Sequence, residues 1–407
     1  MDYRDIVKPE TYTDERYLNS LMQHMRQHDA VPFIETEDYK PFWIATRHAD
    51  ILEIERQHGT FVNTFKSVLE NRETEAKLDE TGPWLRTLIH MDDPEHALFR
   101  GLTRDWFLPG NLNKFDSRIR AIATATVDQM LALGGEMDFV KDVAVWYPLR
   151  IIMMILGIPE SDESYMLRLT QELLGDADPD VSRTSSSPDD RMALIAEFFD
   201  YFRTIIADRK VNPSDDVAST IAHGLIDGEP LNEMDVISYY VIIATAGHDT
   251  TSSAIAGGVR ALIDNPEQLE LLLQASEQTP LVVDEAIRWT SPVKHFLRYA
   301  AEDYELRGRN IKAGDAIMLL YPSGNRDEEV FDEPFAFKSD RRPNRHLAFG
   351  HGVHHCLGNL LAKMEMVYLY DEIFRRVRSI ELNGEPRIMA SNFVTGLKSL
   401  PIRVKAK

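Results

Sequence analysis

The chain contains a single cysteine in 407 residues, Cys356, which lies in the segment HLAFGHGVHHCLGN at residues 346–359. A lone cysteine cannot form an internal disulfide, so the thiol is inert, reactive or a ligand. The run after Cys356 has helical periodicity, which places the cysteine just before or at a helix N-terminus, where free N–H groups and the helix dipole favour a thiolate. Glycines around it, Gly350, Gly352 and Gly358, would let a flat ligand approach the backbone closely.

Four uses of this thiol are chemically reasonable. It could be a small buried apolar side chain, which is the ordinary state of an isolated cysteine, or a nucleophile with His354 or His355 as its base. A zinc site would use His351, His354, His355 and Cys356, although four ligands within six residues do not easily converge on one tetrahedral centre. An axial thiolate on haem iron needs only one protein sulfur. The residues of this segment alone leave all four uses open.

A long helix is expected to position this chemistry. Between Pro230 and Pro266 lie 35 residues without proline, which begin at a plausible cap, Asn232, and stay apolar for several turns. Such a helix would be about 50 Å long and would cross the centre of the domain. Its middle, AGHDTTSS at residues 246–253, contains Gly, Asp, Thr and Ser, which disfavour helix interiors. This conflict indicates a functional site, a distortion or a solvent-facing polar turn.

The rest of the chain predicts a mostly α protein with minor β. Short strand-like runs occur at residues 41–46 and 316–320, and loops are expected at residues 63–90 and 176–190, the second either a solvated linker or a mobile lid. The net charge of −21 argues against binding to nucleic acid or to an anionic membrane surface. The N-terminus lacks the apolar core of a signal peptide and the apolar run of a membrane span, so we expect a cytoplasmic protein.

The pattern F-G-x-G-x-H-x-C-x-G, present from Phe349 to Gly358, resembles the haem-binding signature of the cytochrome P450 family. Further segments match that family in order: AGHDTT at 246–251, the E-x-x-R of DEAIRW, and RRPNRHLAFG at 341–350. The similarity covers essentially the whole chain and implies a single P450 domain, 1–407, mostly α with minor β, with a long central helix over a haem held by a cysteine-containing loop. It is strongest to soluble bacterial members that hydroxylate monoterpenes, such as α-terpineol, and alkyl-aromatic hydrocarbons.

The resemblance also implies roles for individual residues. Cys356 would be the axial ligand of haem b (iron protoporphyrin IX), with further cofactor contacts from Phe349, Gly350, Ala246 and Gly247. The haem propionates would be bound by His96, Arg100, Arg298 and His354. Asp249 and Thr250 would be the acid–alcohol pair that passes protons, and the loop would be braced by Glu285, Arg288 and Arg341. Substrate contacts are predicted at Ala246, Thr250, Val293, Phe296, Phe393 and Val394.

The implied reaction uses dioxygen, two electrons and two protons to insert one oxygen atom into a C–H bond of a small hydrophobic substrate. No G-x-G-x-x-G follows a strand, so electrons must come from outside the chain; the resemblance implies a 2Fe-2S ferredoxin and its NAD(P)H-dependent reductase. An acidic ferredoxin would dock on a basic patch, predicted from Arg104, Lys114, Arg341, Arg342, Arg345 and Lys363. Two alternatives remain: a haem-thiolate gas or redox sensor without turnover, and a zinc- or thiol-dependent hydrolase.

Overall fold

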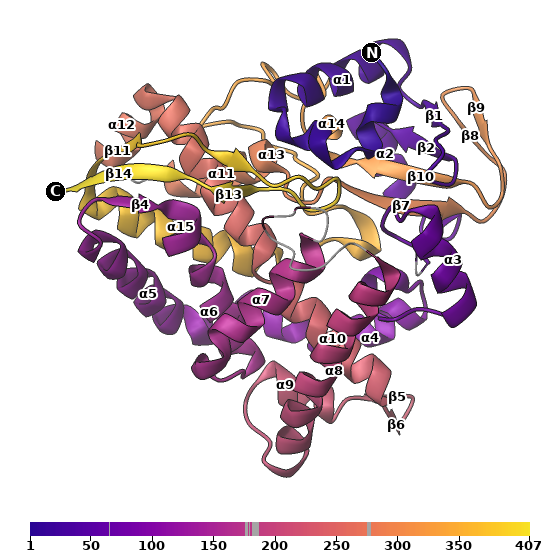
Figure 1. Cartoon of the computed structure of the whole chain (residues 1–407), viewed down its shortest axis with the longest axis horizontal. Coiled ribbons are helices and arrows are strands. Elements are labelled where there is room, and N and C mark those ends of the chain that lie inside the picture. The colour runs from indigo at the N-terminus through magenta and orange to yellow at the C-terminus, as the bar shows by residue number, and fades with distance from the viewer. Residues whose placement is uncertain (65, 176–177, 179, 181–186, 275–277) are drawn as a thin grey trace.

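The computed structural model describes residues 1–64, 66–175, 178, 180, 187–274 and 278–407. Helices predominate, as predicted for a mostly α protein with minor β (Figure 1). The α-helices are α1 (Glu15–His28), α2 (His48–Glu55), α3 (Arg72–Thr81), α4 (Glu95–Arg104), α5 (Pro109–Ala132), α6 (Trp146–Leu156), α7 (Glu163–Leu174), α8 (Pro188–Val211), α9 (Val217–Ala222), α10 (Glu233–Ala246), α11 (Asp249–Asp264), α12 (Pro266–Gln274), α13 (Thr279–Thr290), α14 (Tyr321–Gly324) and α15 (Asn359–Arg376).

The strands are short and gather at two sides of the molecule. They are β1 (Phe33–Ile34), β2 (Phe42–Ala45), β3 (Phe61–Val62), β4 (Glu136–Asp138), β5 (Leu225–Ile226), β6 (Glu229–Pro230), β7 (His295–Ala300), β8 (Tyr304–Leu306), β9 (Arg309–Ile311), β10 (Ala316–Leu320), β11 (Val377–Leu382), β12 (Arg387–Ile388), β13 (Leu397–Ser399) and β14 (Pro401–Ala406). The largest sheet has the order β1-β2-β10-β7-β3 and lies beside the N-terminal helices, while β11, β14 and β4 pair near the C-terminus (Figure 1).

The apolar run of β10 explains why the larger sheet is covered on both faces. Successive side chains of a strand point to opposite faces. Met318 and Leu320 belong to one apolar cluster with residues of α1, whereas Ile317 and Leu319 belong to another with Ile51 and Ile54 of α2. The predicted strands at 41–46 and 316–320 are confirmed as β2 and β10, which pair in parallel. The sheet thereby fixes α2 beside β7.

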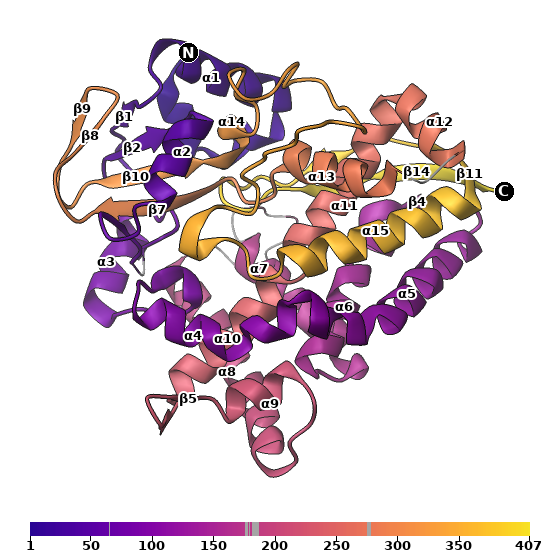
Figure 2. The same ribbon diagram turned by 180° about the vertical axis from the view of Figure 1, so that it is seen from behind.

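The predicted long central helix is present and is capped by Asn232 as expected, but a break at Gly247 and His248 divides it into α10 and α11. At Gly247 a Cβ would lie 2.5 Å from Cγ1 of Ile152 on α6, so close packing excludes a larger residue there. The expected distortion in AGHDTTSS is therefore present. Seen from behind, α15 lies between α5 and α13 and runs from the middle of the molecule to its edge beside the C-terminus (Figure 2).

The predicted loop at residues 63–90 is also wrong, since it contains α3. Asn71 caps this helix by accepting a hydrogen bond from the backbone N–H of Thr74 at 2.8 Å, and Gly82 ends it. Most of the predicted loop at 176–190 lies outside the described residues; its last three residues begin α8, capped by Ser187. No helix in the described part of the chain combines the length and the apolar character that a membrane span needs.

Candidate active site

The cysteine segment and the α10–α11 break line one cavity of about 250 Å³. Its walls come from residues distant in sequence: α4, α10, α11, β7 and the start of α15 all contribute. Most of the lining side chains are apolar, among them Leu88, Ile89, Phe107, Ile152, Ile242, Ile243, Ala254, Ile287, Val293, Phe296, Leu361 and Met366. Polar and ionisable groups are confined to a few positions, described below.

Cys356 lies three residues before α15, close to the predicted position at a helix N-terminus. Its backbone N–H donates to the carbonyl of Phe349 at 2.8 Å, and its carbonyl accepts from Nδ2 of Asn359 at 2.7 Å, so the segment is closed on itself. Burial raises the pKa of the Cys356 thiol, while the N–H of Gly358 and the charge of Arg100 oppose that rise. The cavity is therefore lined by one thiol, with two groups that stabilise its anion.

Two glycines of this segment lie against Glu55, whereas the sequence predicted a flat ligand beside them. Gly350 and Gly352 have φ values of +65° and +67°, which favour glycine. A Cβ on Gly352 would lie 2.3 Å from the carbonyl oxygen of Glu55, and one on Gly350 would lie 3.2 Å from Oε1 of the same residue. The expectation that these glycines make room for a ligand is wrong for Gly352, because the end of α2 takes that space.

Four basic side chains line the cavity together, as the sequence predicted for His96, Arg100, Arg298 and His354. The rings of His96 and His354 lie 4.1 Å apart, and Nε2 of each is buried without a hydrogen-bond partner among the described residues. Burial, reinforced by the nearby guanidiniums, lowers the pKa of both histidines, that of His354 to about 2.

The two arginines bond mainly to backbone carbonyls. Arg100 donates to the carbonyl of His355 at 2.7 Å, and Arg298 donates to the carbonyl of Leu297 at 3.0 Å. Within the described residues, Arg100 forms no ion pair with a carboxylate. Buried cations and unpaired donors are unfavourable unless an anion satisfies them. One thiol and this cluster therefore fit haem, a flat group with one iron and two carboxylates.

Asp249 and Thr250 are neighbours at the start of α11 but line different cavities. Thr250 lines the cavity of Cys356 and donates from Oγ1 to the carbonyl of Ala246 at 3.1 Å. Asp249 lines an adjacent cavity, with Oδ1 3.1 Å from Nε2 of the buried His248 and Oδ2 buried without a hydrogen-bond partner among the described residues. The two side chains of the pair thus face separate cavities from adjacent positions of one helix.

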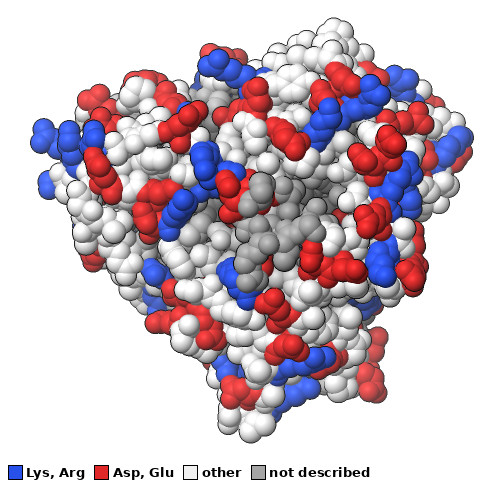
Figure 3. Space-filling view, in the orientation of Figure 1, with Lys and Arg blue, Asp and Glu red and all other residues white. Residues whose placement is uncertain are grey.

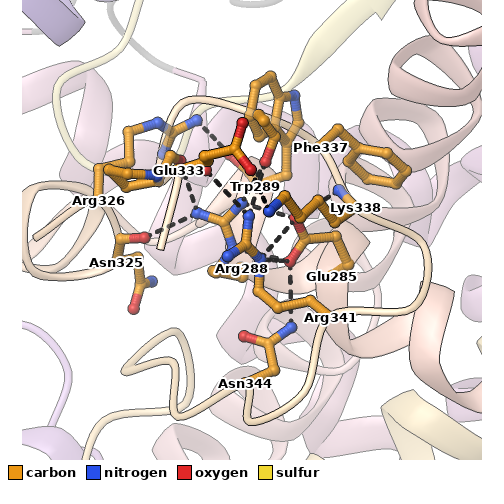
Figure 4. A network of polar contacts seen from close by, with 12 residues as sticks. Glu285, Arg288, Trp289, Asn325, Arg326, Glu333, Phe337, Lys338, Arg341 and Asn344 are labelled. Carbon is orange, nitrogen blue, oxygen red and sulfur yellow. Dashed lines mark hydrogen bonds and ion pairs between the residues drawn. The ribbon is translucent and has the colours of Figure 1, made fainter. Parts of the chain in front are cut away.

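Glu285, Arg288 and Arg341 meet in a buried network (Figure 4). Arg288 donates to the Glu285 carboxylate from Nε at 2.8 Å and from Nη2 at 2.7 Å. Arg341 donates from Nε to both carboxylate oxygens, at 3.0 and 2.9 Å, and Asn344 donates from Nδ2 at 3.1 Å. One carboxylate therefore serves two guanidiniums, which makes these bonds charge-assisted.

This network continues toward the cysteine segment. Arg288 also donates to the carbonyl of Asn325 at 2.9 Å, and Oδ1 of Asn325 accepts from the backbone N–H of Leu347 at 2.6 Å. Arg341 donates to the carbonyls of Asp332 and Ala336. α13 is thus connected by hydrogen bonds to the chain that leads into the cysteine segment.

The structure separates the six predicted substrate contacts into two groups. Ala246, Thr250, Val293 and Phe296 line the cavity. Phe393 and Val394 are absent from its lining: Phe393 packs edge-on against Phe296, and Val394 pairs with Val293 through an isolated β-bridge and faces the adjacent cavity. These two residues therefore lie behind the predicted contacts and support them.

Sequence reasoning missed two carboxylates that line this cavity, Glu55 and Glu365. Burial raises the pKa of Glu365 well above its usual value, and the nearby Thr251 opposes that rise. The signal for Glu365 was available, because it interrupts the apolar face of α15 between Leu361 and Leu369. Glu55 gave no such signal, since it precedes the polar pair Arg56 and Gln57 in sequence.

The predicted basic patch is only partly formed. The prediction that Arg341 belongs to this patch is wrong, because its side chain is buried against Glu285. Lys363 pairs with Asp284 at 2.7 Å. The exposed members are Arg104, Lys114, Arg342 and Arg345. On the face in Figure 3, acidic and basic side chains are interspersed. In the part of the chain that is described, no group of three or more His, Cys, Asp or Glu could hold a metal ion, so the zinc alternative lacks a site.

Comparison with known proteins agrees with this geometry. The family described as Cytochrome P450 matches residues 162–406. Cytochrome P450-terp from Pseudomonas sp is 44% identical over 412 residues, covering 98% of this chain and 96% of the relative, and linalool 8-monooxygenase from Pseudomonas putida is 30% identical over 99% of both. The crystal structure of CYP108D1 from Novosphingobium aromaticivorans superposes with a TM-score of 0.92 at 40% identity, covering 100% of this chain and 98% of that one. The chain therefore belongs to the cytochrome P450 family of monooxygenases, whose cofactor is haem with a cysteine thiolate as axial ligand.

Proposed function

We propose that this monooxygenase hydroxylates a small hydrophobic molecule, a monoterpene or an alkyl-aromatic hydrocarbon, with electrons from a 2Fe-2S ferredoxin and its reductase. The observation that carries the proposal is that Cys356 and Thr250 line the same cavity, whose other walls are mostly apolar. Apolar walls suit a hydrocarbon, and the basic side chains of the cavity are assigned below to the haem propionates. The names of two relatives, Cytochrome P450-terp and linalool 8-monooxygenase, support a terpene as the substrate.

Bound haem supplies the redox chemistry by which one atom of dioxygen enters a C–H bond. The residues of this chain hold and tune it. Cys356 provides the thiolate, whose donor strength is set by the N–H of Gly358 and by Arg100. We assign the propionates to His96, Arg100, Arg298 and His354, because each lines the cavity and the two histidines have a buried Nε2 with no hydrogen-bond partner in the described part of the chain.

The proposed proton path runs through Asp249 and Thr250. Asp249 faces the adjacent cavity, which is also lined by Arg387 and Lys398, while Thr250 faces the haem cavity. A proton taken up by the Asp249 carboxylate can reach the Thr250 hydroxyl through water at the α10–α11 break, where the helical hydrogen bonds are interrupted. Thr250 then holds that proton within the cavity where dioxygen reacts.

The electron donor is proposed to dock near the cysteine segment. Arg342 and Arg345 are exposed just before that segment, and Arg104 and Lys114 are exposed at and beyond the end of α4. In a chain of net charge −21, such a group would attract a small acidic partner through electrostatic complementarity that salt weakens. Reduction rates should therefore fall with ionic strength, and Arg345→Glu should lower the rate while leaving the spectrum of substrate binding unchanged.

The deciding experiment is a titration of the purified holoenzyme with a panel of terpenes and alkylbenzenes. We expect an absorbance change that reports displacement of iron-bound water, followed by oxygen consumption and one hydroxylated product per dioxygen. A sensor would bind the ligand without substrate-dependent oxygen consumption, and that result would overturn the proposal. Cys356→Ser tests the ligand separately: the reduced, carbon monoxide-treated variant should lack the red-shifted band of thiolate ligation, and retention of that band would refute the assignment.

A further inference from the structure

Glu55 is a buried carboxyl group at the end of α2 whose presence in the cavity is unexplained by the proposed function. Its side chain is 1% exposed. Oε1 accepts a hydrogen bond from the Tyr321 hydroxyl at 2.8 Å and lies 3.9 Å from Nη2 of Arg298. Oε2 is buried and, among the described residues, has no hydrogen-bond partner. An unsatisfied buried oxygen is unfavourable, so a ligand atom that satisfies it would be stabilising.

The groups around Glu55 determine its charge. They are Arg298 from β7, Tyr321 from the start of α14, and the backbone N–H of His351 from the cysteine segment. Burial raises the pKa of Glu55 to about 7, although these three groups favour the anion. Burial also raises the pKa of Tyr321 well above its usual value, so Tyr321 stays a neutral donor. Arg298 is thus the one cation among the groups that act on Glu55.

A second carboxylate at Arg298 would make Glu55 a donor. Arg298 lines the same cavity and is a proposed partner of a haem propionate. One guanidinium would then face two carboxyl groups, and like charges at one site favour protonation of one of them. A protonated carboxyl has an O–H that can donate to a carboxylate in a short, charge-assisted bond. The free oxygen Oε2 is available for that proton.

We propose that Glu55 is a further haem-binding residue, which as a carboxylic acid donates a hydrogen bond from Oε2 to the propionate held by Arg298. The inference rests on the proposed assignment of Arg298 to a propionate. Glu55 also packs beneath Gly350 and Gly352, so the same side chain contacts the cysteine segment and the propionate end of the cavity. Loss of its proton places two anions beside Arg298, which weakens haem retention and lowers the midpoint potential of the iron.

Two variants of the holoenzyme test this inference. Glu55→Gln keeps the length, the neutrality and an N–H donor at every pH, whereas Glu55→Leu removes the donor. The measurements are the rate of haem transfer to excess apomyoglobin and the midpoint potential, each from pH 6 to 9. We expect the wild type to lose haem about 10- to 100-fold faster at the alkaline end of this pH interval than at its acidic end. A change in rate of this size is expected for the loss of one hydrogen bond to a charged group.

Glu55→Gln should lose haem slowly at every pH, and Glu55→Leu should lose it quickly at every pH. Equal pH slopes in the wild type and Glu55→Gln would overturn the inference, and this pair decides the question even where Glu55→Leu does not fold. The reduced carbon monoxide spectrum distinguishes a failure of the proposed function from a failure of the role inferred for Glu55. A missing thiolate band in the wild type would refute the proposed function, whereas a normal band with equal slopes would refute the role of Glu55 alone.

Discussion

Replacing Glu285 by Gln tests whether the buried network on α13 supports the cysteine segment. The substitution keeps the shape of the side chain and removes its charge. Arg288 is fully buried and Arg341 is 6% exposed, so both guanidiniums would lose the one carboxylate that they share. Removing one partner of a buried ion pair costs about 3–5 kcal/mol, because the remaining charge is uncompensated.

The corresponding fall in melting temperature follows from the length of the chain. An unfolding entropy of about 2.1 cal/mol/K per residue gives roughly 0.85 kcal/mol/K for 407 residues, so Glu285→Gln should lower the Tm by about 4–6 °C. Circular dichroism and haem absorbance should be followed in the same thermal scan. Because the network leads into the chain before Cys356, we expect haem absorbance to be lost at a lower temperature than helical signal.

A matched control is Glu233→Gln, which breaks an exposed ion pair with Arg203. Exposed pairs contribute little, so this variant should melt with the wild type. The argument that this carboxylate supports the segment would be refuted if the Tm of Glu285→Gln lies within about 1 °C of the wild type and the variant loses haem absorbance and helical signal at the same temperature.

Three further changes have defined outcomes. Gly352→Ala should destabilise the holoenzyme by at least about 2 kcal/mol in urea titrations, from the positive φ and the clash with Glu55, whereas Gly110→Ala, at an exposed position away from the cavity with no described atom within 4 Å of the added Cβ, should not. Thr250→Ala should lower product formed per NADH roughly tenfold or more and raise hydrogen peroxide, and unchanged coupling would remove Thr250 from the proton path. Burial raises the pKa of Glu55 to about 7, so the unfolded chain releases this proton at a lower pH than the folded protein does. The free energy of unfolding of the wild type, relative to Glu55→Gln, should therefore fall as the pH rises from about 4.5 to 7, by about 3 kcal/mol at most. A constant difference between the two proteins over that range would contradict the burial argument.

The sequence predicted features that depend on local spacing. The cysteine lies just before a helix as expected, and the i,i+3 spacing of Glu285 and Arg288 places both on one face of α13, where they bond. Apolar runs predicted β2 and β10 because a strand buried on both faces needs no polar alternation. Each of these features is determined mainly by residues within one or two helical turns, or by a single run of apolar residues.

Features that depend on distant partners could not be predicted in this way. The polar residues in AGHDTTSS indicated a distortion, but the close packing of Gly247 against Ile152 of α6 involves a partner distant in sequence. The helix α3 was missed because it is short and polar, and its cap at Asn71 was not recognised. Glu55 acquires its environment from Arg298, Tyr321 and the cysteine segment, all more than 240 residues away in sequence.

The cysteine segment is held by two carboxyl groups with opposite roles. Glu285 accepts from two guanidiniums, an amide and the backbone N–H of Lys338, so several donors compensate its charge. Among the described residues, Glu55 has one guanidinium at 3.9 Å, one hydroxyl donor and the nearby backbone N–H of His351, and its Oε2 has no hydrogen-bond partner. The number of donors therefore distinguishes the two carboxyl groups, and Glu55 is the one that fits the role proposed above, the exchange of a proton when a propionate binds Arg298.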